Sequence, residues 1–210
     1  MKKCILLIVC VAFLFASISA SAEIEGFELG HMEENFYIND ALGISMEAGD
    51  IYQNNGGYLT YTCEELDETN GAAYDDIPAL EAILKEGNSV ICLYYANMDR
   101  RIIGKVNNLK LFVYLAAEGD ENPETTVLNK GLEEIQKEAD DKGYTLTKGD
   151  VSELELGGSL WSRISIDLAN GDRHIQMTYA AVQKGECVYL LVMNINDDTV
   201  EDYFAYFQAR

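Results

Sequence analysis

Five side chains in the C-terminal third of the sequence form the most suggestive set for chemistry. Alternation places them on one face of two neighbouring predicted strands, and they are Trp161, Arg163, Asp167, His174 and Gln176. Opposite charges, an amide and an aromatic ring on one sheet face could hold a small anion or stack against a sugar ring. An ordinary cross-strand ion pair between Asp167 and His174 explains the same pattern, and such pairs contribute only about 0.2–1 kcal/mol. We take these five residues as the candidate ligand-binding set.

Nucleophilic catalysis receives little support from the sequence. A nucleophilic serine needs a sharp turn from a strand into a helix, whereas Ser159 follows a glycine pair and precedes a predicted strand. A cysteine nucleophile needs a histidine base beside its thiol, and neither His31 nor His174 lies in a pattern that joins a histidine to a cysteine. We therefore expect no catalytic residues and a non-enzymatic protein.

Acidic loops raise the question of a metal site. The segment Asp120-x-Asn122-x-Glu124 begins like a calcium-binding loop. A proline lies inside it, however, and the twelfth position holds Gly131 where such a loop needs a glutamate. This segment and residues 194–198 are better explained as the starts of helices. The sequence also lacks phosphate-binding glycine loops and dinucleotide fingerprints, so we expect neither a metal centre nor a cofactor.

Two predicted hairpins must position the candidate set. Strands are expected over residues 151–156, 160–168, 174–182 and 187–195. Asn170-Gly171 is a strong signal for a two-residue hairpin turn and would place Asp167 opposite His174. Lys184-Gly185 is expected to turn the next hairpin in the same way.

Alternation of side chains gives this predicted sheet two different faces. One face is continuous core, formed by Ile164, Ile166, Ile175, Met177, Tyr179, Val188, Leu190 and Val192. The other face carries the charged candidate residues toward the first turn and is apolar at its far end, at Trp161, Ala180, Tyr189, Leu191 and Met193. A sheet with apolar surface on both faces must be covered on both.

Three predicted helices could supply this cover. The first begins at Asp76, whose side chain can cap it, and ends near Gly87. The second opens at Asn122-Pro123, and its apolar stripe consists of Leu128, Leu132, Ile135 and Ala139. The third spans residues 198–207 and presents on one face Val200, Tyr203, Phe204 and Phe207. We therefore predict an α+β fold of three layers in the order helix, antiparallel sheet, helix.

The rest of the chain is predicted to complete one domain over residues 23–210, because no repeat or linker divides it. Extended segments are expected over residues 27–29, 36–38, 44–46, 89–95 and 109–116, with turns at the glycine pairs 56–57 and 157–158. Cys92 and Cys187 lie in apolar runs and are predicted core residues. The remaining cysteine count is odd, and Cys63 is either free or bonded.

Charge and the N-terminal segment restrict partners and compartment. The chain has 36 acidic and 15 basic residues and a formal charge of −21, so nucleic acids and anionic membrane surfaces would repel it. Residues 1–22 combine two lysines, an apolar stretch and a small-residue end, which is the order of a secretory signal. Cleavage is expected before Glu23 and removes two lysines and no acid, leaving −21 − 2 = −23. Lipidation of Cys10 is the alternative to its removal.

The expected location is therefore secreted or extracellular, either free or at the cell surface. No stretch after the signal approaches the ~18 apolar residues that a membrane span needs, so the mature chain is expected to have no transmembrane segment.

The order of elements and several short motifs resemble a PsbP-like domain, in particular those of exported proteins of unknown function from Gram-positive bacteria. The resemblance spans nearly all of residues 36–208. The motifs are Tyr37-Ile38-Asn39-Asp40, Leu42-Gly43-Ile44, Glu64-Glu65-Leu66, Gly87 followed by Ile91 and Tyr95-Ala96, Gly157-Gly158 and the closing segment Tyr203–Phe207. Gly57-Tyr58 stands where such proteins often have a Gly-Trp turn. The resemblance implies an accessory or binding module and supplies no catalytic residues.

These observations predict an exported non-enzymatic accessory or protein-interaction domain whose partner is a protein or small ligand at the cell surface. The alternative is a protein that binds a small ligand or a divalent cation through the candidate set or the acidic loops, and a hydrolase is the least favoured function. An exposed apolar patch would favour the first function, and a concave pocket with convergent polar groups the second. A histidine within hydrogen-bond reach of a thiol, hydroxyl or carboxylate would favour the third.

Overall fold

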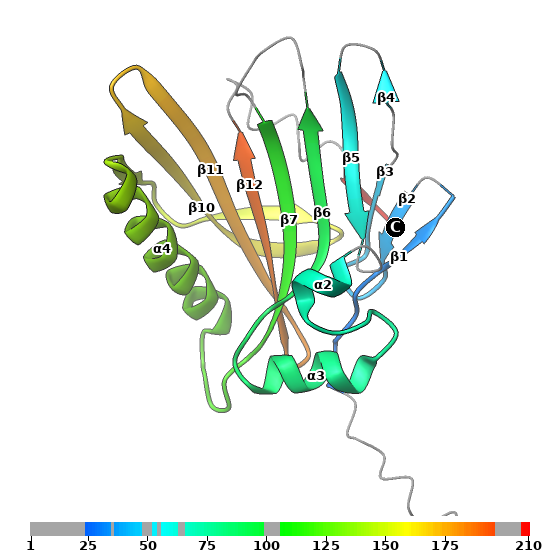
Figure 1. The fold of residues 1–210 in the computed structure, drawn as a ribbon. Coiled ribbons are helices and arrows are strands. Elements are labelled where there is room, and N and C mark those ends of the chain that lie inside the picture. The colour runs from blue at the N-terminus through cyan, green and yellow to red at the C-terminus, as the bar shows by residue number, and fades with distance from the viewer. Residues whose placement is uncertain are drawn as a thin grey trace, which may run out of the picture.

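A computed structural model describes residues 24–34, 36–47, 52–53, 56–62, 66–98, 106–195 and 207–210 of the chain. The predicted signal peptide, Cys10, Cys63 and most of the predicted C-terminal helix lie outside these residues. The described part is dominated by antiparallel strands, with three helices (Figure 1). No helix in the described part is long and apolar enough to cross a membrane.

A large antiparallel sheet forms the centre of the fold. Its path runs β4-β5-β6-β7-β12-β11-β10-β8, and β9 pairs with β10 beside β8. In chain order these strands are β4 (Tyr52–Gln53), β5 (Gly56–Thr62), β6 (Val90–Met98), β7 (Val106–Leu115), β8 (Thr145–Lys148), β9 (Ser152–Leu156), β10 (Ser159–Asn170), β11 (Arg173–Lys184) and β12 (Cys187–Ile195). The glycine pair 56–57, predicted as a turn, lies inside β5 instead, because β5 pairs with both β4 and β6.

Both predicted hairpins form, but their registers differ from the prediction by two residues. The first hairpin turns at Gly171-Asp172, so Asp167 lies opposite Gln176 and not opposite His174. The second turns at Gly185-Glu186. In each turn only the glycine has a positive φ, as a type II′ turn requires, whereas the predicted turn needed positive φ at two residues. A shift of two residues keeps each side chain on its face, so the predicted faces are unchanged.

Helix α4 (Pro123–Lys142) covers one face of the large sheet (Figure 1). Its predicted stripe is buried against the predicted continuous face in one cluster that includes Leu128, Leu132, Ile135, Ala139, Ile164, Ile166, Met177, Tyr179, Val188 and Leu190. The helix ends at Gly143, which has a φ of 73° and leaves the helix in the left-handed conformation. The sequence predicted this layer correctly, because a stripe at helical spacing and a strand pattern of period two are both strong signals.

The opposite face has a different cover from the predicted one. A small antiparallel sheet covers it, in the order β1 (His31–Glu33), β2 (Phe36–Asn39), β3 (Ile44–Glu47) and β13 (Phe207–Ala209), together with helix α3 (Ile77–Lys85). The short helix α2 (Asp67–Asn70) lies near β6. Asp76 caps α3 by accepting a hydrogen bond from the amide of Ala79 at 3.2 Å, as predicted.

The predicted C-terminal helix is wrong at its last residue. Phe207 begins strand β13 and pairs with Met46, because the buried Phe207 side chain and the open edge of β3 favour an added strand. The earlier residues of that prediction lie outside the described part. The described layers are therefore helix, large sheet, and small sheet with helix, and the three-layer helix, sheet, helix arrangement is not reproduced.

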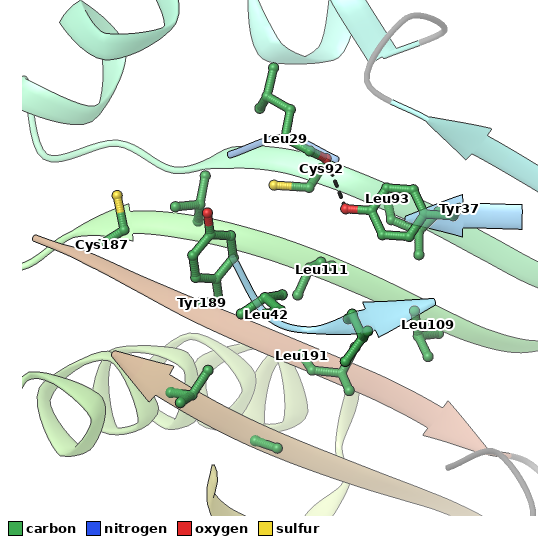
Figure 2. Close-up of a cluster of buried hydrophobic side chains, with 14 of the residues drawn as sticks. Leu29, Tyr37, Leu42, Cys92, Leu93, Leu109, Leu111, Cys187, Tyr189 and Leu191 are labelled. Carbon is green, nitrogen blue, oxygen red and sulfur yellow. Dashed lines mark hydrogen bonds between the residues drawn. The ribbon is translucent and has the colours of Figure 1, made fainter. Parts of the chain in front are cut away.

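The small sheet and the large sheet enclose the second half of the core. The Tyr37 hydroxyl donates to the Leu29 carbonyl at 2.8 Å (Figure 2). The Tyr189 hydroxyl donates to the Gly26 carbonyl at 2.7 Å. Figure 2 also shows Cys92 and Cys187 in this core, and both side chains are buried, as predicted. Residues 27–29 are predicted as extended, but they form no strand.

The turn between β9 and β10 touches the small sheet directly. Gly157 and Gly158 both have positive φ, which confirms the predicted turn. A Cβ on Gly157 would lie 2.3 Å from the Leu42 carbonyl oxygen, so only glycine permits this approach. The small sheet is thereby held over the end of β10 that carries Trp161.

Candidate functional site

An open groove lies on the face of the large sheet opposite α4, which we call the inner face. It lies toward the turn that joins β10 and β11. The groove has a volume of about 420 Å³. Its polar lining consists of the side chains of Thr147, Lys148, Arg163, Ser165, Asp167, Gln176 and Thr178. We call this feature the polar groove. Three of the five predicted candidate residues line it, so the structure brings together the charged and amide part of the set.

Strand pairing explains why these side chains converge. Thr147, Asp167 and Gln176 lie directly opposite one another on β8, β10 and β11. Ser165 lies opposite Thr178 in the next row. Side chains two residues apart on a strand point to the same face, so the two rows and Arg163 share one surface.

Lys148, which is exposed, and Arg163 both bring positive charge to the groove. Arg163 is the more buried of the two. It is half-buried, and its Nε donates to the Ser152 hydroxyl on β9 at 3.1 Å. No ion pair of Arg163 occurs within the described part of the chain. The guanidinium is therefore oriented through Nε, while its two Nη groups have no carboxylate partner there.

Thr178 supplies a buried hydroxyl. The residue lines the groove and is 1% exposed, and its Oγ1 has no hydrogen-bond partner. Leaving a buried polar group unsatisfied costs roughly 1–3 kcal/mol. The sequence prediction did not select Thr178 or Ser165, although their parity on β10 and β11 matches that of Arg163 and could have identified them.

Asp167 and His174 lie close together, as predicted, but by a different geometry. His174 Nδ1 lies 3.6 Å from Asp167 Oδ2, with side-chain exposures of 60% and 42%. The two residues are diagonal neighbours, since Ala169 lies opposite His174. At this distance the contact is electrostatic and not a hydrogen bond, and an exposed pair contributes at most about 1 kcal/mol. His174 therefore sits at the rim and positions Asp167 weakly.

Trp161 is not available to a ligand, contrary to its place in the candidate set. Its side chain is 1% exposed, and its indole Nε1 donates to the Leu156 carbonyl at 3.1 Å. The ring belongs to the core between the two sheets. The small sheet covers this end of β10. Its strands lie far from β10 in the sequence, so the alternation of side chains within β10 could not reveal this cover.

The described thiols are poorly suited to nucleophilic catalysis. Burial, with a smaller effect of Glu186, raises the pKa of the Cys187 thiol to about 12, so it stays protonated at neutral pH. Cys187 pairs with Lys184 at one end of β11, and His174 lies near the other end. Ten residues of strand span roughly 33 Å, so this cysteine and this histidine cannot act together.

One cluster of described residues has the composition of a metal site. Ligand atoms of Glu28, His31 and Asp40 lie within 4.8 Å of one another. The Glu28 carboxylate already accepts the amides of Asp40 at 2.9 Å and Ala41 at 2.7 Å. Asp40 also accepts a hydrogen bond from Arg210 at 3.2 Å. These contacts fix the turn between β2 and β3 and explain the cluster without a cation.

The acidic segment before α4 leads into the helix, but the side chain of the N-cap residue Asn122 makes no capping hydrogen bond. Asp120 accepts a hydrogen bond from the Asn122 amide at 2.9 Å. Hydrogen bonds from Thr126 and from this amide hold the pKa of the Asp120 carboxyl below its ordinary value. The other acidic segment, beyond residue 195, lies outside the described part.

Comparison with known proteins yields structural likenesses only. No family model and no curated protein matches the sequence. The chain is similar to the solution structure of cyanobacterial PsbP (CyanoP) from Synechocystis sp. PCC 6803, with 12% identity and a TM-score of 0.43 over 87% of this chain and 99% of that chain. It is also similar to LpqN of Mycobacterium tuberculosis, described as involved in cell envelope biogenesis, with 12% identity and a TM-score of 0.33 over 54% of this chain and 65% of that chain.

A protein of unknown function from Pseudomonas aeruginosa is a further structural neighbour, with 11% identity and a TM-score of 0.33 over 84% of this chain and 92% of that chain. CyanoP is a PsbP protein, and PsbP-like domains are the family that the sequence resembles. At these identities and TM-scores, membership of that family stays a prediction.

Proposed function

We propose that this chain is an exported, non-enzymatic accessory domain that binds a small carboxylate-bearing ligand in the polar groove. The observation that carries the proposal is Arg163, whose guanidinium is oriented by Ser152 and has no ion pair with a described residue. In a chain with 36 acidic and 15 basic residues, such an arginine is available to an anion from outside. The planar guanidinium matches a carboxylate through two parallel hydrogen bonds.

The neighbouring groups support a carboxylate more than a sugar ring. Stacking on a sugar needs an exposed aromatic face, and Trp161 is buried. The groove instead offers donors besides Arg163, namely the Lys148 ammonium, the hydroxyls of Ser165 and Thr178 and the Gln176 amide. A small anion with additional polar atoms uses all of these groups.

The surface of the described residues favours a small ligand over an apolar protein partner. Their exposed large hydrophobic side chains are spread along the chain and are Met32, Phe36, Tyr74, Ile77, Val151 and Leu160. Protein docking sites usually gather such side chains in one patch. The export part of the proposal is supported by the signal-like order of residues 1–22.

A binding titration tests this function. We expect succinate to raise the melting temperature of the purified protein in a saturable way, because a ligand that binds only the folded state stabilises it. The neutral analogue succinamide should have no such effect. Arg163→Gln should weaken succinate binding by about tenfold or more, as expected for the loss of a charge-assisted hydrogen bond.

Arg173→Gln is the matched control, because it removes the same charge from an exposed position that does not line the groove. It should leave succinate affinity within about twofold of the unchanged protein, given screening of exposed charges. Equal losses in the two variants, or equal effects of succinate and succinamide, would show that the groove does not recognise a carboxylate.

A further inference from the structure

A second cavity lies on the opposite face of the large sheet, beside α4. Its volume is about 440 Å³. Phe112, Tyr114 and Tyr179 give it an aromatic floor, and α4 forms its wall with Lys130, Glu134 and Glu138, which are spaced four residues apart. We call it the helix-side cavity. Sequence analysis did not predict it, because it depends on how α4 leaves part of β7 and β12 uncovered.

The two lysines of this cavity are already engaged within the protein. Lys130 Nζ donates to the Gly87 carbonyl at 3.3 Å and lies 5.2 Å from the centre of the Tyr114 ring. Lys110 Nζ lies 5.5 Å from the centre of the Tyr94 ring. Both ammonium groups therefore have aromatic partners, and their charge is directed at those rings.

Two hydrogen-bond acceptors of this cavity stay open among the described residues. Asn194 lines the cavity, and its Oδ1 is buried without a hydrogen-bond partner. Glu134 forms no ion pair with a described residue, whereas Glu138 pairs with Lys142. The Tyr179 phenol stays neutral, because burial and the two nearby glutamates raise its pKa to about 12. These two acceptors favour a ligand that brings a hydrogen-bond donor and a positive charge.

We propose that the helix-side cavity binds an organic ammonium ion with a short apolar body. The ammonium pairs with Glu134, and the Asn194 carbonyl oxygen accepts a hydrogen bond from the ligand. The apolar body lies against Phe112 and the aliphatic side chains of Met177 and Val192, which also line the cavity. The volume is within the range of small-molecule sites. This site is independent of the polar groove, since it lies on the other face of the sheet and prefers the opposite charge.

Three matched compounds test the proposal by calorimetry and by chemical-shift mapping on the full chain. Phenethylamine, which is cationic at pH 7, should bind saturably, and its signals should map to β7, β12 and α4. The neutral 2-phenylethanol and the anionic 3-phenylpropionate should bind this cavity at least about tenfold more weakly, because neither offers a charged donor to Glu134.

Glu134→Gln should weaken phenethylamine binding by about tenfold, whereas Glu133→Gln, on the exposed side of the same helix turn, should have little effect. Both substitutions are isosteric on an exposed helix surface, and thermal unfolding confirms that each variant folds. Equal binding of the alcohol and the amine, equal losses in the two variants, absence of saturable binding, or shifts confined to the polar groove would each overturn the proposal.

Discussion

Arg163 and Thr178 both leave hydrogen-bonding groups without a partner in the described part of the chain. The hydrogen bond to Ser152 already orients the Arg163 side chain. Arg163 therefore loses less conformational entropy when it binds an anion. Thr178 leaves a buried hydroxyl without a partner. Unsatisfied buried polar groups are uncommon in folded proteins, and a functional role is one explanation for the Thr178 hydroxyl.

Thr178→Val tests the role of the buried hydroxyl. Valine has nearly the same shape, so we expect the free energy of unfolding to rise by about 1 kcal/mol once the unsatisfied group is removed. Succinate affinity should fall in the same variant. Chemical denaturation and calorimetry measure the two effects.

Thr147→Val is the control, because Thr147 lines the same groove but is exposed. Its free energy of unfolding should stay within about 0.5 kcal/mol of the unchanged protein. A clear loss of stability in Thr178→Val would mean that the hydroxyl is already satisfied in the folded protein.

At the scale of elements, the strand faces were predictable but the strand registers were not. Alternation assigned Met177 and Tyr179 to the α4 side and Arg163 to the inner side, and this survives any shift by two residues. Register depends on which residues occupy the turn. Asn170-Gly171 and Gly171-Asp172 are both reasonable turns, and only backbone geometry distinguishes them.

The turn between β10 and β11 gives an element-scale prediction. Gly171 alone has a positive φ there, at 60°. Gly171→Ala should therefore lower the free energy of unfolding by about 1–2 kcal/mol, because a Cβ disfavours the left-handed region. Urea denaturation measures the change.

Asn170→Ala and Asp172→Ala should each change the free energy of unfolding by less than about 0.5 kcal/mol, apart from the weak contact of Asn170 with the Lys142 carbonyl. A large loss for Asn170→Ala, comparable with that of Gly171→Ala, would favour the register with Asn170 inside the turn.

At the scale of the whole molecule, the cover of the inner face decides which predicted residues can bind a ligand. The small sheet joins segments from both ends of the chain, since β13 pairs with β3. It buries Trp161 and leaves Arg163 and Gln176 at the open end of the same strands. Such long-range pairing has no local sequence signal, which is why the sequence could not show that Trp161 is buried while Arg163, Asp167 and Gln176 line the groove.

Two buried groups predict how stability depends on alkaline pH. Burial raises the pKa of Tyr179 from 10.0 to about 12 and that of Cys187 from 9.0 to about 12. Above pH 9 the unfolded chain loses these protons first and binds fewer protons than the folded chain. The free energy of unfolding should therefore fall as pH rises from 9 to 12 and should be unaffected by these groups below pH 8.

Urea denaturation between pH 7 and pH 11.5 measures this slope. Tyr179→Phe should make the slope shallower above pH 10, while Tyr74→Phe, at an exposed position, should leave it unchanged. An identical slope in the Tyr179→Phe variant would contradict the burial of that phenol between the large sheet and α4.

The most direct test of the central claim follows the Arg163 side chain by NMR during a titration with succinate. The account predicts that the Arg163 Nε signal shifts and saturates with the same dissociation constant that calorimetry gives, together with backbone signals of Ser165 and Thr178, while the Arg173 Nε signal stays in place. An unchanged Arg163 signal at saturating succinate, or equal shifts of both arginines, would contradict a carboxylate site in the polar groove.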